Sequence, residues 1–296
     1  MLLSFVILCR VVANPFSNVF QKVVTRQNAH PLFVILVTHA LLAALCFPFV
    51  LVRAHEISEN LPRSFWLNIS AVAVPTVVGN ALLVQAVKLS DLSVLGPVNA
   101  YKSVISLIPG MLLLGEFPGL FGVAGIAMIV AGSYFVVDKK VTQPRRNVLV
   151  RFFTERGIQY RFAAMAVSAV EAVFLKKALL ASSPLVTFAS WAILGFAGGA
   201  LATAAFIGRD LQSQRQIATA NSLTFASLAL STGLMQLCTI IVLGGFQVGY
   251  ALALFQTSTL LTVFLGYKVF KEENILERLT GSVVMVAGAV IIVLGK

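Results

Sequence analysis

The chain is poor in charged residues, and poorest in acidic ones. Only 11% of its 296 residues are charged, and 11 Asp and Glu stand against 22 Lys and Arg. Hydrophobic residues make up 58% of the chain, which is more than a soluble domain normally carries. This composition excludes an ordinary water-soluble globular protein.

Signatures of metal sites and enzymes are also missing. The three cysteines, Cys9, Cys46 and Cys238, fall in hydrophobic stretches, and their spacing fits neither a metal site nor a disulfide framework. We expect them to pack as small side chains. The sequence has no HExxH motif, nucleophile elbow, phosphate-binding glycine loop or paired catalytic carboxylates. We therefore expect no enzyme activity, no cofactor and no metal.

Long hydrophobic stretches take up most of the chain instead. A helix needs about 20 apolar residues to cross a bilayer. The stretches that approach this length cover residues 2–24, 31–52, 65–87, 93–114, 120–137, 162–180, 185–207, 222–243, 248–270 and 276–294. The first stretch lacks the basic start and the cleavage site of a signal peptide, so we expect it to remain as a helix. The basic residues lie mainly between stretches, where they help to fix topology, so we expect no nucleic-acid partner.

The end of the chain repeats its middle. The stretch that starts at Leu114 reads LGEFPGLFGVAGIAMIVAGSYFVV, and the one that starts at Phe270 reads FKEENILERLTGSVVMVAGAVIIV. The offset of 156 residues that aligns Glu116 with Glu272 also aligns Gly125 with Gly281 and Gly132 with Gly288. The repeat predicts residues 1–138 and 162–296 as two five-helix units, with residues 139–161 as a basic linker.

The odd number of helices in each unit sets the orientation of the second unit in the membrane relative to the first. A second copy of five helices must enter the membrane in the opposite sense to the first. The predicted fold is therefore an all-α integral membrane protein with ten transmembrane helices in two inverted five-helix repeats. Inverted repeats usually hold a substrate site near the middle of the bilayer, which favours a transporter.

The sequence resembles a known transporter family on these same stretches. The segment DLSVLGPVNAYKSVISLIPGMLLLGEFPGLFGVAGIAMIVAGSYFVV, with its LLLGE helix end and glycine-rich helix, resembles EamA-type members of the drug/metabolite transporter superfamily. VVANPFSNVFQKVVTR resembles the opening helix of that family, and LTVFLGYKVFKEENILERLTGSVVMVAGAVIIVL resembles the repeated element with Lys-Glu-Glu in place of Leu-Gly-Glu. The resemblance implies ten helices, a central cavity and alternating access, and leaves the substrate open.

Four charged or titratable residues inside predicted helices stand out as candidates: Arg10, His39, Lys102 and Glu171. A charge at the centre of a bilayer costs about 2.5–3.5 kcal/mol on insertion scales, so such residues normally face a cavity or the protein interior. Lys102 either binds an anionic group of the substrate or forms a structural pair with Glu171. Glu171 is also the candidate for proton coupling. Arg10 either reaches the interface or lines the cavity, and His39 either packs against a neighbouring helix or acts as a ligand.

Lys102 also bears on the kind of substrate. The triose-phosphate translocators resemble this chain in having a lysine in the fourth helix, and they add a Lys-Arg pair in the ninth. Here Ser258 stands at the position of the ninth helix that matches Lys102. One cation rather than three predicts a carboxylate or an amino acid as substrate, not a doubly charged phosphate.

Neutral polar residues inside the predicted helices complete the candidate site. Each of them, taken alone, is equally expected to link two helices by a hydrogen bond. As a set they predict a wet central cavity with the substrate site in it. The candidate substrate-binding residues are Lys102, Asn99, Tyr101, Asn80, Gln85, Asn14, Asn18, Gln236, Gln256 and Ser258.

Two further local features concern helix breaks and helix caps. Pro97 and Pro109 flank Lys102, and a proline removes a backbone donor, so the predicted helix 93–114 is expected to be loosened on both sides of its charge. Glu116 and Glu272 are expected to cap the helices that follow them.

Together these features predict a secondary transporter, an exporter or exchanger of a small metabolite such as an amino acid or organic acid. Protons or a counter-substrate are further candidate partners besides the substrate and the lipid bilayer. The alternatives are a drug or cation efflux transporter and a membrane scaffold or receptor without transport. The expected location is a bacterial inner membrane. The charge bias of the loops places the termini outside, whereas the family resemblance places them in the cytoplasm.

Overall fold

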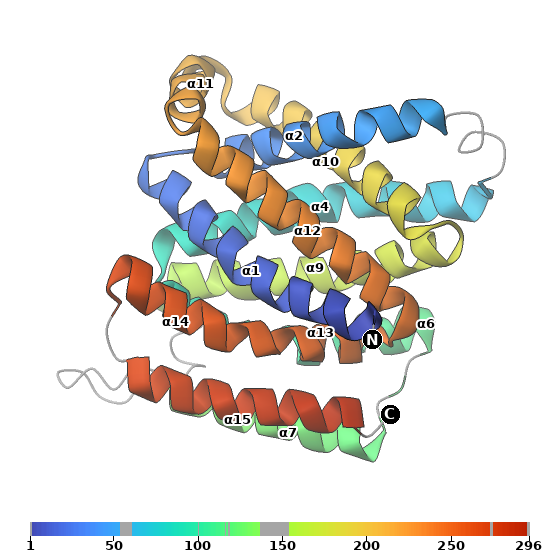
Figure 1. The fold of residues 1–296 in the computed structure, drawn as a ribbon, viewed down its shortest axis with the longest axis vertical. Coiled ribbons are helices and arrows are strands. Elements are labelled where there is room, and N and C mark those ends of the chain that lie inside the picture. The colour runs from blue at the N-terminus through green and yellow to red at the C-terminus, as the bar shows by residue number, and fades with distance from the viewer. Residues whose placement is uncertain are drawn as a thin grey trace.

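The computed structural model describes residues 2–53, 61–99, 101–115, 117, 119–136, 154–272 and 275–294. These residues form helices joined by short turns, with no strand among them (Figure 1). The first half contains α1 (Leu2–Arg26), α2 (Pro31–Val52), α4 (Arg63–Leu89), α5 (Leu92–Val98), α6 (Tyr101–Leu114) and α7 (Leu120–Val136). The second half contains α9 (Arg156–Leu180), α10 (Pro184–Phe206), η1 (Gly208–Asp210), α11 (Leu211–Ala220), α12 (Ser222–Gly245), α13 (Val248–Leu254), η2 (Phe255–Thr257), α14 (Ser258–Phe270) and α15 (Ile275–Leu294).

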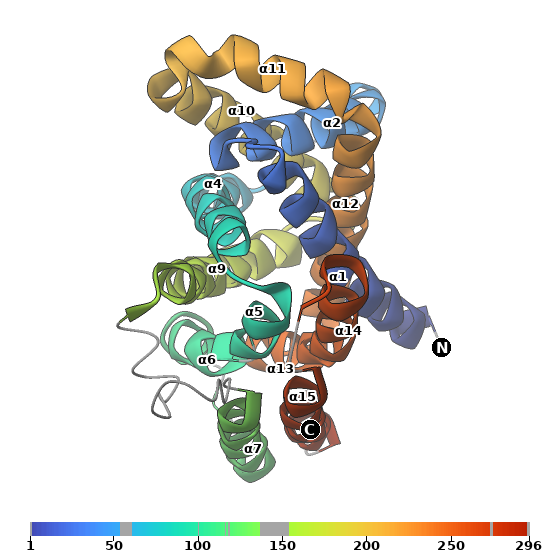
Figure 2. The same cartoon turned by 90° about the vertical axis from the view of Figure 1, so that its left-hand side faces the viewer.

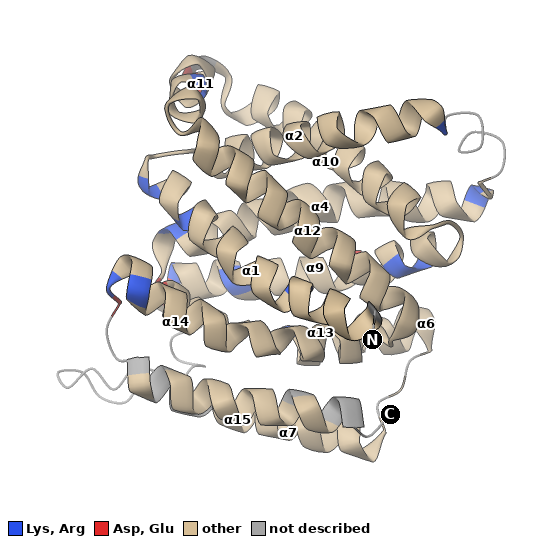
Figure 3. Ribbon diagram, viewed as in Figure 1, with Lys and Arg blue, Asp and Glu red and all other residues tan. Residues whose placement is uncertain are grey.

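The helices have the length and composition of membrane spans. Within the described residues, seven helical segments are long and apolar enough to cross a bilayer, and α7 and α15 are shorter apolar helices. Figure 3 shows most Lys and Arg positions near helix ends, as expected if the helix bodies lie in lipid. The described part of the chain is thus all-helical, and the protein is a multi-pass membrane protein.

The helix α9 starts earlier than the sequence predicted. It begins at Arg156, so residues 156–161, which were assigned to the linker, are helical. The prediction ended the hydrophobic stretch at the first charge, Arg161, but a helix continues through a charged residue whose side chain finds a polar surrounding. The remaining residues of the predicted linker lie outside the described part of the chain, except for residues 154 and 155.

Two predicted helices are broken at matching places. The stretch 93–114 divides into α5 and α6 at Asn99, and the stretch 248–270 divides into α13 and α14 at the 3-10 turn η2. Pro97 in α5 supplies no backbone donor, which weakens the first helix at its break. No proline lies at the second break. There the hydroxyls of Thr257 and Ser258 donate to the carbonyls of Leu254 and Phe255, at 2.9 and 2.7 Å, and such bonds compete with the regular helix pattern.

The helices α7 and α15 pack side by side at one end of the molecule (Figure 2). A Cβ atom on Gly132 would lie 2.9 Å from the carbonyl oxygen of Gly281, and one on Gly288 would lie 2.6 Å from that of Gly125. The numbers rise along one helix as they fall along the other, so the two helices are antiparallel. Glycine at these positions allows the backbones to approach closely, as at many helix contacts in membranes.

The main hydrophobic core lies among α4, α9, α10 and α12. Phe65, Ile69, Leu175, Ile240 and Leu243 are all buried in it. The cluster joins residues from both halves of the chain, so neither half buries its apolar surface alone.

The helix α11 was not predicted, because it is short and mostly polar. It lies against the turn between α1 and α2. There Gln214 accepts a hydrogen bond from the backbone N–H of His30 at 2.7 Å and donates to the carbonyl of Asn28 at 3.4 Å. Burial is the main cause that lowers the pKa of His30. The positive charge of the nearby Lys88 lowers this pKa further, and the negative charge of Asp210 partly opposes both effects.

Candidate functional site

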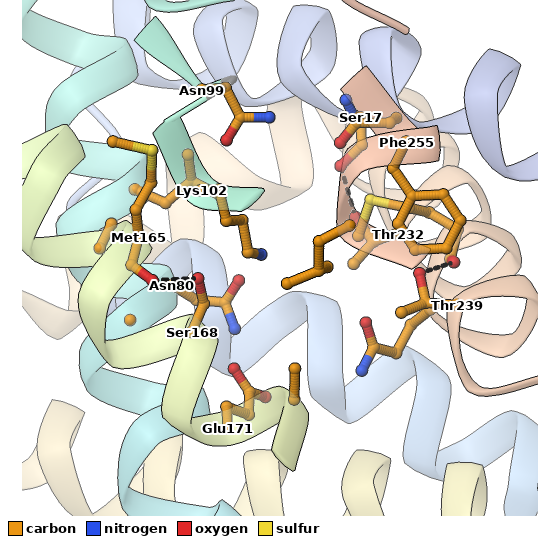
Figure 4. A pocket seen from close by; sticks show the side chains of 18 of the residues that line it. Ser17, Asn80, Asn99, Lys102, Met165, Ser168, Glu171, Thr232, Thr239 and Phe255 are labelled. Carbon is orange, nitrogen blue, oxygen red and sulfur yellow. Dashed lines mark hydrogen bonds between the residues drawn. The ribbon is translucent and has the colours of Figure 1, made fainter. Parts of the chain in front are cut away.

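A polar cavity of about 110 Å³ lies inside the helix bundle, between α1, α4, α6, α9, α12 and the break in the ninth predicted helix (Figure 4). A buried water molecule needs roughly 10–15 Å³ of such volume, so the cavity has room for several waters or a small metabolite. A second cavity of about 10 Å³ lies beside it and shares Asn14, Asn18, Asn99 and Arg161 with it. Both cavities are lined by residues from the two halves of the chain.

Most of the candidate residues from the sequence meet at these cavities. The main cavity is lined by Asn14, Asn18, Asn80, Asn99, Lys102, Glu171, Gln236 and Gln256. Ser258 lines the smaller cavity. Tyr101 and Gln85 line neither of the two. Tyr101 instead packs its ring against Phe162, with 5.5 Å between the ring centroids. It lies one residue before Lys102 in the helix and therefore points in another direction.

Lys102 lies in the first turn of α6, directly after the break. Its backbone N–H donates to the carbonyl of Asn99 at 2.9 Å, and its amine points into the cavity in Figure 4. The Asn99 amide donates to Gln256 across the cavity at 3.3 Å. The break therefore presents the charge of Lys102, and the carbonyl and amide groups around it, to the cavity rather than to lipid.

Glu171 faces the same cavity from α9 but is not in a salt bridge with Lys102. Its Oε1 atom accepts hydrogen bonds from the Thr76 hydroxyl at 2.7 Å and from the Trp191 indole N–H at 3.1 Å. Lys22, by contrast, forms salt bridges with Glu272 at 2.8 Å and with Asp91 at 3.6 Å. A carboxylate that two neutral donors already hold does not need the lysine as its partner.

Arg10 lines the cavity from α1 and does not reach the membrane interface. Its Nε atom donates to the Thr239 hydroxyl at 2.8 Å, and its guanidinium carbon lies 4.3 Å from the centre of the Phe255 ring. The residue is 7% exposed, and its Nη1 atom is buried without a hydrogen-bond partner. Of the two interpretations of Arg10, the structure supports the one that places it in the cavity.

Arg161 is a cavity residue that the sequence analysis missed. It comes from the first turns of α9, is 7% exposed, and has a buried Nε atom without a hydrogen-bond partner. The sequence feature that could have identified it is its position directly before the hydrophobic stretch 162–180, because the helix can extend by one or more turns beyond that stretch. The inference that the site holds a single cation is therefore wrong, because Arg10 and Arg161 line the cavity that Lys102 faces.

His39 lies outside the cavity and serves helix packing. Its Nδ1 atom lies 3.1 Å from the carbonyl oxygen of Ile35, and its ring packs against Trp191 with 4.7 Å between centroids. Gly195 makes room for the ring, because a Cβ atom there would overlap it. By holding Trp191, His39 also supports the indole that donates to Glu171.

A buried charge cluster joins α1 to the start of α5. Lys22 donates to Glu272 at 2.8 Å and to the carbonyl of Ser90 at 3.2 Å. Glu272 in turn accepts from the backbone N–H groups of Leu92 and Ser93, at 3.0 and 2.8 Å. Burial alone would raise the pKa of Glu272, but the hydrogen bonds from Lys22 and Ser93 outweigh it and lower this pKa below its ordinary value.

This cluster corrects one prediction from the sequence. Glu272 was expected to cap the helix that follows it, but it caps α5, which is far away in the sequence. Lys271 ends α14 in the left-handed conformation (φ 57°), and this turns the chain so that Glu272 reaches α5. The other predicted cap, Glu116, lies outside the described residues.

Comparisons with known proteins agree with this picture. The model of the EamA-like transporter family matches residues 2–138. Twenty-six chains of solved structures match the chain. One of them is a crystal structure whose alignment covers 99% of this chain and 96% of the chain in that structure. The TM-score of 0.69 shows a shared fold at 14% sequence identity. No curated protein matches the chain. The match over residues 2–138 confirms the expected resemblance to EamA-type members of the drug/metabolite transporter superfamily.

Proposed function

We propose that the protein is a secondary transporter, an exporter or exchanger that moves a small anionic metabolite by alternating access around the central cavity. The observation that carries the proposal is the cavity itself. It lies inside a bundle of membrane-spanning helices and is lined by amides and by the amine of Lys102, from both halves of the chain. A polar site in this position is costly in lipid and is best explained by a water-soluble substrate.

The proposal includes two inverted five-helix repeats, residues 1–138 and 162–296. Several contacts support it by occurring twice at matching positions. Lys22 binds the carbonyl of Ser90, and Lys176, 154 residues after Lys22, binds that of Phe246, 156 residues after Ser90, at 2.7 Å. The glycine contacts between α7 and α15 are reciprocal, and both broken helices divide at aligned residues. Pairs of broken helices at corresponding places of two repeats are typical of transporter substrate sites.

Glu171 is the proposed proton-coupling residue. It is buried, lines the cavity, and is the one carboxylate among the described lining residues. The arrival of the substrate's negative charge in the cavity would favour the uptake of a proton by Glu171, which would tie substrate movement to proton movement. The residues that line the cavity carry more positive than negative charges, and this disfavours the alternative that the protein exports cations. The proposed location is a bacterial inner membrane, which uses gradients of the kind that such a mechanism needs.

Counterflow in proteoliposomes tests this function. Purified protein is reconstituted with an unlabelled amino acid or organic acid inside, and uptake of the same labelled compound is measured against protein-free vesicles. The proposal predicts accumulation that depends on the protein and on internal substrate. A protein that is correctly inserted, binds acidic metabolites and yet catalyses no exchange would instead be a membrane receptor or scaffold.

A further inference from the structure

The charges that line the main cavity are unbalanced. Arg10, Lys102 and Arg161 bring three cations from three helices, and Glu171 brings one carboxylate. These described residues leave a formal excess of two positive charges in one cavity. Burying a charge is costly unless another charge or several hydrogen bonds compensate it.

The protein's own groups satisfy the anion but not the cations. Thr76 and Trp191 both donate to Glu171, whereas Arg10 Nη1 and Arg161 Nε are buried without a hydrogen-bond partner. Almost all buried polar groups in proteins find a partner, so each exception calls for an explanation. Two guanidinium groups with unused donors beside one cavity are cations that the protein's own groups leave uncompensated.

The side chain of Arg10 is held in a position that is suited to bind an anion. The Thr239 hydroxyl and the Phe255 ring hold the Arg10 guanidinium in place and leave Nη1 unused. A guanidinium that is fixed in this way loses little side-chain entropy on binding, and its planar donors match a carboxylate or a phosphate. Lys102 adds a point charge, which points into the cavity in Figure 4.

We infer that the substrate is a dianion, either a small dicarboxylate or a phosphomonoester, whose two charges are neutralised by Arg10, Lys102 and Arg161. This inference rests on the proposed transport function and revises the carboxylate or amino acid that a single lysine predicted. The cavity of about 110 Å³ has room for several waters, so it admits only a small metabolite.

A matched pair of ligands tests the charge of the substrate. Succinate and succinamate have the same number of heavy atoms, but succinamate carries a neutral amide in place of one carboxylate. Glycerol 3-phosphate represents the phosphomonoesters. Binding to the purified full-length protein is measured by isothermal titration calorimetry in detergent, and transport by counterflow. We expect at least one of the two dianions to bind tenfold or more tightly than succinamate, and its identity distinguishes dicarboxylates from phosphomonoesters.

Variants on one helix connect this preference to the cavity. Arg161→Met should weaken dianion binding at least tenfold and change succinamate binding less than threefold, and Arg161→Lys should restore part of the difference. Lys177→Met removes a cation from the same helix outside the cavity and should change neither. Elution from a size-exclusion column and helical circular dichroism check that each variant is folded.

The outcomes separate this inference from the proposed function. Equal affinity for succinate, glycerol 3-phosphate and succinamate, or an Arg161→Met protein that is folded and keeps the full preference, would overturn the inference and leave transport intact. Failure of both dianions to bind would also overturn it. Tight dianion binding without counterflow would support the inference and contradict the transport function.

Discussion

Glu272 is the residue whose removal should most weaken the fold outside the cavity. It lies at the meeting point of three segments, where it accepts hydrogen bonds from Lys22 and from the backbone N–H groups of Leu92 and Ser93, and it is 7% exposed. Glu272→Ala leaves two helix N–H groups without their acceptor and leaves the buried amine of Lys22 with the Ser90 carbonyl and the more distant Asp91. Breaking one partner of a buried ion pair costs about 3–5 kcal/mol, and we expect a loss of this size in the free energy of unfolding.

The Glu272→Gln variant tests the contribution of the charge separately from that of the hydrogen bonds. The amide oxygen can still accept from one N–H, so this variant should lose less stability than Glu272→Ala. Hydrogen bonds to a charged group contribute about 1.5–3 kcal/mol and neutral ones about 0.5–1.5 kcal/mol, so the expected difference is on the order of 1–2 kcal/mol. Asp210→Asn removes an exposed carboxylate and should change stability by less than about 0.5 kcal/mol.

The contribution of Glu272 to the free energy of unfolding should depend on pH, in a direction that follows from the shift of its pKa. The pKa of Glu272 is lower in the folded state than its ordinary value. Its contribution is therefore present above the unfolded-state pKa of about 4.3 and is lost as the pH falls through the lower, folded-state pKa. Chemical unfolding in detergent, followed by tryptophan fluorescence at several pH values, measures both effects. A Glu272→Ala protein as stable as the wild type, or a Glu272 contribution that grows as the pH falls, would refute the reasoning.

Two further predictions concern helix packing and coupling. Gly132→Ala should destabilise the α7–α15 pair by about 1–3 kcal/mol, because its Cβ would lie 2.7–2.9 Å from Met285 and Gly281. Gly119→Ala is the matched control, since no atom lies within 4 Å of its Cβ, and equal melting temperatures would contradict the close packing. Glu171→Gln should bind substrate but lose the acceleration of uptake by an imposed pH gradient. Unchanged acceleration in this variant would exclude Glu171 as the proton carrier.

The sequence predicts the membrane helices and much of the cavity for simple physical reasons. Apolar stretches of about 20 residues must be helical in lipid, since no water is available for their backbone groups. A polar residue inside such a stretch must avoid lipid, which is why Asn80, Lys102 and Gln236 were expected at a cavity and are found there. The glycines that recur at an offset of 156 residues marked the close contact between α7 and α15.

Other features depend on contacts that no local pattern reveals. Arg161 looks like a linker residue, because a charge at the edge of a hydrophobic stretch can lie on either side of the boundary. The break before Ser258 has no proline and depends on hydroxyl bonds to the preceding turn. Glu272 obeys the rule that carboxylates favour helix starts, but the helix is α5, which only the tertiary fold brings close.

The measurement that tests the account most directly is counterflow with Lys102 changed. Lys102→Met keeps the approximate length of the side chain and removes its charge. Charge-assisted contacts contribute about 1.5–3 kcal/mol, so the apparent affinity for an acidic substrate should fall tenfold or more, and Lys102→Arg should restore part of it. A folded Lys102→Met protein that exchanges the same acidic substrate with unchanged affinity would show that the lysine is structural and that this cavity does not bind the substrate as proposed.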